Sequence, residues 1–152
     1  MASWRQQALV EAPVGEVWNL LCDPGRASEW AEDVISITGG PARIETEGSM
    51  YDVTARGPLG LKATTPFRIE AFEEMREVKM QCQVTGFYTR WLLTEAQGGT
   101  FTELELGVEE LPQGRSLRGR AMTLLHTKSF LRRAVEKTLD GLRRTVGRAS
   151  AT

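Results

Sequence analysis

Few residues in this chain can do acid–base or metal chemistry. His126 is the only histidine, so any imidazole acid or base must be this residue. Lys128 follows two positions later, and its ammonium could meet an acidic head group or an enolate. Cys22 and Cys82 lie far apart, match no metal-ligand spacing, and each suit a small buried side chain better than a disulfide. The sequence therefore predicts no metal site, no cofactor and no cysteine–histidine nucleophile.

An apolar stripe along residues 115–146 determines where these two side chains point. The stripe predicts one helix of about 30 residues and about 45 Å, with all stripe members within about 40° of one line. His126 lies about 180° from the stripe, which predicts that it faces solvent, whereas Lys128 lies about 20° from its centre. A lysine there either extends out of a partly open groove or places its ammonium in a pocket. The stripe consists of Leu117, Ala121, Leu124, Leu131, Val135, Leu139, Leu142 and Val146.

Short runs of alternating residues precede this helix and indicate an antiparallel meander. Two short helices are expected after the first strand, one beginning at Pro13 and one at residues 27–30. One face of such a sheet is buried, and the long helix is the only element large enough to cover it. We therefore predict an α+β fold, a seven-stranded antiparallel sheet wrapped around one C-terminal helix, with residues 1–147 as a single domain and 148–152 as a frayed tail. The expected strands are 3–12, 34–38, 49–56, 62–72, 77–84, 87–96 and 100–109.

Alternation within the strands indicates which polar side chains face inward. Tyr51 shares a predicted inward face with Val53, which makes it the first candidate for a polar pocket residue. Arg68 has the opposite parity to its apolar neighbours, so a cross-strand ion pair with Glu70 on the solvated face is favoured. Arg56 and Arg90 are further candidates, each favoured as a solvated charge. In residues 87–93 both parities carry apolar side chains, and the set that contains Trp91 is expected to face inward.

The charge balance excludes some classes of partner. Nineteen basic and twenty acidic residues give a formal charge of -1, which argues against a nucleic-acid partner. The C-terminal helix is locally basic, and a solvated outer face is favoured over contact with a membrane. No window is apolar enough to span a bilayer and no signal peptide is evident. We expect a cytoplasmic protein with no integral membrane segment, either a monomer or a homodimer.

Several segments carry a family resemblance. They are the run Val10–Leu21, with its APxxxVWxLL pattern, Asp23-Pro24 with Trp30, the strand pair Trp91–Glu95 and Gly99-Thr100, and the helix Ala134–Leu142. In these segments and in the order of its elements, the chain resembles the polyketide cyclase/dehydrase family of the START-like (SRPBCC) superfamily, which has the helix-grip fold of the birch-pollen allergen. The resemblance implies a pocket between sheet and long helix that holds a lipid, a quinone or a polyketide-like aromatic molecule.

The resemblance also implies candidate site residues. Cyclases of this family are thought to orient polyketones and stabilise enolates with inward Tyr, Arg and Ser groups, so Tyr51 and Arg68 are the catalytic candidates. Asp33 stands where characterised cyclases place a tyrosine, which weakens the case for aromatase activity. Three hypotheses follow: a binder or carrier, an aromatase/cyclase enzyme, and a protein-interaction member with a filled core. No acid–base pair is evident, which favours the binder. The residues expected to line the pocket are Trp30, Tyr51, Val53, Phe67, Ile69, Met80, Trp91, Leu104, Met122, Leu125 and Lys128.

Overall fold

The strands form a seven-stranded antiparallel sheet, as the alternation predicts. The computed structural model describes residues 3–31 and 33–151, and in it the strand order is β1-β7-β6-β5-β4-β3-β2. β1 pairs with β7, whereas the other neighbouring strands are consecutive in the chain. The strands are β1 (Ser3–Val10), β2 (Val34–Thr38), β3 (Met50–Arg56), β4 (Lys62–Glu73), β5 (Glu77–Cys82), β6 (Phe87–Ala96) and β7 (Gly99–Val108).

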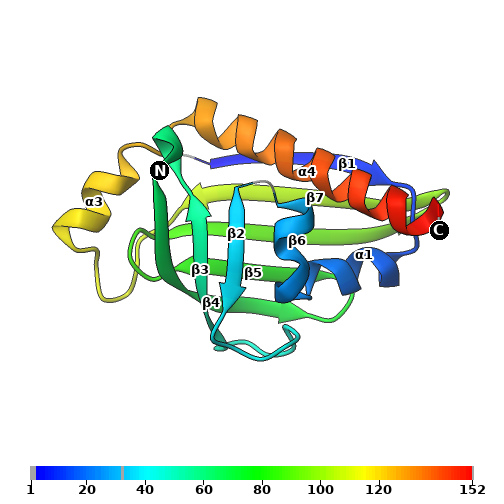
Figure 1. Cartoon of the computed structure of the whole chain (residues 1–152), viewed down its shortest axis with the longest axis horizontal. Helices are drawn as coiled ribbons and strands as arrows, with labels where there is room; N and C mark the ends of the chain where they lie inside the picture. Colours follow the sequence, from blue (N-terminus) through cyan, green and yellow to red (C-terminus); the bar gives the residue numbers. More distant parts are fainter. Residues whose placement is uncertain (1–2, 32, 152) are drawn as a thin grey trace.

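The sheet is strongly curved, and β4 carries much of the bend. Figure 1 shows β2 and β3 crossing in front of β5, β6 and β7, while β4 turns from the first direction into the second. The β4–β5 register shifts between Ile69 and Ala71, and such a bulge bends a strand. After this shift, Phe72 packs against Trp18 in the core, with ring centroids 5.6 Å apart. The bend gives the sheet a concave face.

The segment after β1 forms the two expected short helices, α1 (Val14–Leu21) and α2 (Ala27–Trp30), with one 3₁₀ turn, η1 (Pro24–Arg26), between them. Pro13 occupies the N-cap position of α1, where a missing N–H removes no helical hydrogen bond. α1 buries Val17, Trp18, Leu20 and Leu21. In the view of Figure 1, α1 lies near the C-terminal end of α4, whereas α2 lies closer to its middle.

The expected long C-terminal helix is present, but it begins at Lys128, so the prediction of one continuous helix over residues 115–146 was wrong. α3 (Leu117–Thr123) and α4 (Lys128–Ala151) are separated by a four-residue junction, Leu124–Thr127. Thr127 begins α4, because its Oγ1 accepts a hydrogen bond from the Phe130 backbone N–H at 3.2 Å. Ser116 caps α3 in the same way, accepting from the Gly119 N–H at 3.0 Å. The apolar stripe continues through the junction, but the capping threonine ends the helical geometry that the stripe assumes.

The break divides the stripe into a buried half and an exposed half. Leu117 and Leu124 are 85% and 81% exposed, because α3 projects from the end of the molecule opposite the C-terminus. The stripe residues of α4 that are buried in the core are Leu131, Val135, Leu139, Leu142 and Val146. Residues 148–151, where a frayed tail was expected, continue α4, and Thr152 lies outside the described residues. α4 therefore covers part of the concave face, and α3 does not continue its buried apolar stripe.

A close helix–helix approach fixes the position of α4. A Cβ on Gly141 would collide with the backbone carbonyl oxygen of Trp30, at the end of α2. One turn later, Thr145 Oγ1 lies 3.1 Å from the Glu29 carbonyl oxygen and 2.9 Å from that of Gly141. Glycine at position 141 thus permits α2 and α4 to pack backbone against backbone.

This contact makes a prediction about stability. Replacing glycine by alanine within a helix ordinarily stabilises it by roughly 0.5–1 kcal/mol, but at Gly141 the new methyl group must push α2 and α4 apart. We expect Gly141→Ala to lower the free energy of unfolding by about 1–3 kcal/mol, as for an overpacked core. Urea denaturation followed by circular dichroism measures this change.

Gly147 provides the matched control on the same helix, since a Cβ there meets no atom within 4 Å. Gly147→Ala should leave the free energy of unfolding unchanged or raise it by up to about 1 kcal/mol. Equal effects of the two alanine substitutions would contradict the proposed role of the α2–α4 approach.

Candidate ligand-binding site

A cavity of about 260 Å³ lies between the concave face of the sheet and the helices. Its walls come from β2 to β7 on the sheet side, and from α2, α3, the α3–α4 junction and α4 on the helix side. Ligand pockets usually measure about 300–1,000 Å³, whereas an engineered cavity of about 150 Å³ already holds benzene. The cavity therefore has room for a ligand of a few fused rings.

The cavity wall is mainly apolar because the strands alternate as expected. Trp91 is buried and faces inward, together with Phe87 and Thr89 of the same strand, so the predicted inward parity of β6 is confirmed. Trp30 of α2 packs edge to face on Trp91, with ring centroids 5.5 Å apart and ring planes at 80°. This aromatic pair joins the helix wall to the sheet wall.

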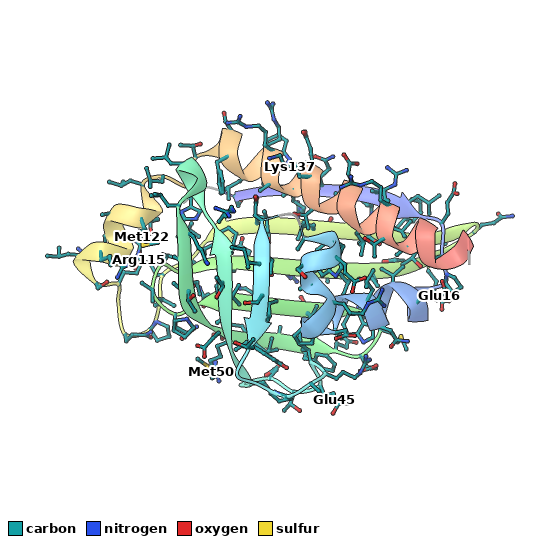
Figure 2. The ribbon with its side chains drawn as sticks, in the orientation of Figure 1. Glu16, Glu45, Met50, Arg115, Met122 and Lys137 are labelled. Atoms are coloured by element: carbon teal, nitrogen blue, oxygen red, sulfur yellow. The ribbon has the colours of Figure 1, made fainter. Side chains whose placement is uncertain are left out.

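Most of the residues that were expected to line the pocket do line this cavity; that they contact a ligand stays a prediction. The exceptions are Tyr51, Ile69 and Lys128, which do not contribute to the cavity wall. Ile69 is fully buried in the core instead. Figure 2 shows Met122 on α3, the projecting helix, from which this side chain contributes to the wall. The expected residues found in the wall are Trp30, Val53, Phe67, Met80, Trp91, Leu104, Met122 and Leu125.

Tyr51 faces inward, but its side chain contacts the loop between β2 and β3 and does not line the cavity. Its hydroxyl donates a hydrogen bond to the Pro41 carbonyl oxygen at 2.8 Å. A Cβ on Gly40 would lie 2.7 Å from the Tyr51 ring, so the loop between β2 and β3 passes directly over the phenol. Burial raises the pKa of Tyr51. The first candidate for a polar pocket residue therefore anchors this loop.

Arg68 and Lys128 do not contribute to the cavity wall. Arg68 is exposed, and its Nη1 donates to Glu70 Oε2 at 3.0 Å, a pair within one strand instead of the expected cross-strand pair. Lys128 is exposed at the first position of α4. The prediction that Lys128 lies near the centre of the buried apolar stripe was wrong, because it assumed a continuous helix through the junction.

His126 shows the opposite error, since it was expected to face solvent and instead lines the cavity. Its Nδ1 lies 3.1 Å from the carbonyl oxygen of Met122. The imidazole packs between Phe87 and Phe130, with centroid distances of 5.1 Å and 5.5 Å. Burial lowers the pKa of His126, although the hydrogen bond to Met122 acts in the opposite direction. The α3–α4 junction turns this ring from the solvent side of a helix into the wall of the cavity.

Of the remaining polar groups of the wall, Arg56 was a further candidate from the sequence, favoured there as a solvated charge, whereas the threonines were not singled out. Thr65 and Thr89 share the parity of Phe67 and Trp91, so alternation could have identified them, and Thr138 lies one helical turn from Ala134. Asp33 and Arg56 lie in the wall where β2 and β3 meet, and the Arg56 backbone N–H donates to the Asp33 carbonyl oxygen at 2.8 Å. Hydroxyl groups thus outnumber charges in this wall.

Two exposed leucines mark where the cavity reaches solvent. Leu61, between β3 and β4, is 62% exposed, and Leu125, in the α3–α4 junction, is 36% exposed, yet both line the cavity. The entrance therefore lies between the β3–β4 connection and the junction. Within residues 3–31 and 33–151, no group of His, Cys, Asp and Glu could hold a metal ion. No helix in those ranges is both long and apolar enough to cross a membrane.

A protein-family model described as polyketide cyclase/dehydrase and lipid transport matches residues 1–147. No protein of curated function matches the sequence significantly. Solved structures share the fold: a START superfamily protein from Mycobacterium smegmatis has a TM-score of 0.72 at 13% identity, covering 97% of this chain and 98% of that chain. A protein from Thermus thermophilus has a TM-score of 0.71 at 21% identity, with 98% and 99% covered. An AHSA1-like protein from Aeromonas hydrophila has a TM-score of 0.69 at 16% identity, with 99% and 96% covered.

The environment of His126 makes a prediction about its titration. Because burial disfavours the charged ring, we expect a pKa below the usual 6.5 in the folded chain. The unfolded chain then binds a proton first as the pH falls, so the histidine lowers the stability of the fold below about pH 6.5 and has no such effect above it. A ¹H–¹⁵N titration reports this ring without ambiguity, since the chain has one histidine. A pKa at or above 6.5 would contradict a dominant effect of burial on this ring.

Proposed function

The chain belongs to the polyketide cyclase/dehydrase and lipid transport family, and we propose that it binds one hydrophobic, aromatic small molecule in the cavity between sheet and helices. The observation that carries this proposal is the apolar cavity of about 260 Å³, with the Trp30–Trp91 pair in its wall. Its volume favours a quinone or a polyketide-like aromatic over a long-chain lipid, because an extended acyl chain needs more room than a few fused rings.

The energetics of such a ligand support binding of modest affinity. A fused bicyclic ring system has about the area of a tryptophan side chain, roughly 200 Å². At about 25 cal/mol per Å², its burial contributes about 5 kcal/mol before the cost of association. A dissociation constant near the millimolar end is therefore expected for the smallest ligands, and larger ligands that fill the cavity should bind more tightly.

A binding function is favoured over the two alternatives. A filled core would leave no cavity, and the cavity therefore counts against a purely protein-binding role. A cyclase of the expected kind needs a tyrosine or arginine directed at its substrate. The chain has two tyrosines: Tyr51 is hydrogen-bonded to Pro41, and Tyr88 lies under the Lys79 ammonium, 4.7 Å from its ring centroid. Neither of them belongs to the cavity wall, and Arg56, an arginine that does, is an exposed residue at the end of β3.

Filling the cavity tests this proposal. Ala134 lies on the face of α4 that lines the cavity, so Ala134→Phe should place a phenyl ring where the ligand would bind. We expect at least a tenfold loss of affinity, about 1.4 kcal/mol, for the methyl ether of naphthol. Changes in the indole N–H signals of Trp30 and Trp91 during an NMR titration measure the affinity.

Lys137→Phe is the matched control, because it adds the same ring to the outer face of the same helix. Lys137 is exposed, and Figure 2 shows its side chain directed away from the sheet. This variant should bind the ether as the unchanged protein does. Ala134→Leu is a smaller substitution that should weaken binding less than phenylalanine does. Equal affinity in all four proteins would place the ligand outside the cavity and overturn the proposal.

A further inference from the structure

The hydrogen bond of His126 determines which of its ring nitrogens carries the proton. Nδ1 lies 3.1 Å from the Met122 carbonyl oxygen. A carbonyl oxygen can only accept a hydrogen bond, so Nδ1 must be the donor. In the neutral ring Nε2 then has no proton and can only accept.

The packing of the ring holds this nitrogen in a defined orientation. Phe87 of β6 lies nearly alongside the imidazole, with ring planes at 32°, and Phe130 of α4 meets it edge to face, at 86°. The hydrogen bond to Met122 adds a third restraint from α3. An acceptor that is held from three elements in a mainly apolar wall can discriminate between ligands, because leaving it unpaired on binding is unfavourable.

His126 differs in this respect from the threonines in the wall. The hydroxyl groups of Thr65, Thr89 and Thr138 can donate as well as accept, so they can adapt to either kind of ligand group. Neutral His126 offers only a lone pair at Nε2. Burial lowers the pKa of the ring, which keeps it neutral at pH 7.5. A ligand that displaces water from this nitrogen must therefore supply a donor.

We infer that Nε2 of His126 is the specificity-determining acceptor of this cavity, and that the ligand is an aromatic molecule whose phenolic or enolic hydroxyl donates a hydrogen bond to it. The inference rests on the proposed function, since it names the chemical class of ligand for the same cavity. It requires no covalent step: the hydroxyl keeps its proton, and the ring keeps its tautomer.

A naphthol and its methyl ether test this inference, because methylation removes the donor and leaves the ring system intact. We expect the unchanged protein to bind naphthol about tenfold more tightly than the ether, the value of one hydrogen bond. In His126→Phe, which keeps the aromatic packing without an acceptor, this ratio should fall to about one through loss of naphthol affinity. In His126→Gln, whose carbonyl can accept, part of the preference should return.

Lys128→Met is the matched control, since it alters an exposed side chain two residues away and should keep the tenfold ratio. A direct readout needs no variant: naphthol should move the ¹⁵N resonance of Nε2 in His126, and the ether should not. Equal binding of both compounds, or a preference that survives in a folded His126→Phe protein, overturns the role of His126 and leaves the cavity proposal intact. Failure of both compounds to shift the Trp30 and Trp91 signals overturns the proposed function itself.

Discussion

The backbone contact between α2 and α4 at Gly141 is the constraint on which the rest of the structure depends. A curved sheet presents more concave surface than one helix can cover, so the position of that helix decides which part of the surface stays open. Gly141 and Thr145 hold α4 against the backbone carbonyl groups of Trp30 and Glu29 in α2. From there, the apolar face of α4 runs beside β1 in the core (Figure 1). The part of the concave face that α4 leaves uncovered becomes the cavity. Trp30 of α2 takes part both in the backbone contact with Gly141 and in the cavity wall.

The junction between α3 and α4 then decides which side chains face that open space. In an unbroken helix, Lys128 would lie within the apolar stripe and His126 on the solvent side. Thr127 ends this arrangement by capping α4, and Gly119 lets α3 pack closely against the Val84 carbonyl oxygen of the β5–β6 turn. The chain between these two anchors cannot continue the helix. It directs His126 into the wall and leaves Lys128 in solvent, which suits the apolar cavity because a buried ammonium would need a partner.

The sequence predicts the sheet better than it predicts the site, and the reason is physical. Alternation has a period of two, so each strand carries its own evidence of which face is buried, and Phe67, Met80 and Trp91 point inward as expected. The predicted face of a residue in a long helix depends instead on every residue being helical between it and the residue from which the angle is counted. One cap within the segment, at Thr127, inverts the prediction for His126. Thr127 belongs to the residue types that favour caps, but an apolar stripe that persists across it hides the signal.

The prediction of Tyr51 as a pocket residue failed for a different reason, because a loop covers this side chain. The loop between β2 and β3 passes over the phenol, and the Pro41 carbonyl oxygen accepts its hydrogen bond. Parity identifies the face of a strand that a residue occupies, but it cannot show whether a loop or a ligand occupies the space above it. Here the loop satisfies the hydroxyl, and this inward tyrosine becomes structural. Under the proposed function, selectivity within the wall would then come from threonine hydroxyl groups, from Asp33 and Arg56, and from the imidazole, whose hydrogen bond to Met122 leaves Nε2 as an acceptor. A ligand that pairs with Nε2 would stabilise this same junction by mass action, so recognition of the ligand and stability of the junction would be linked through one side chain.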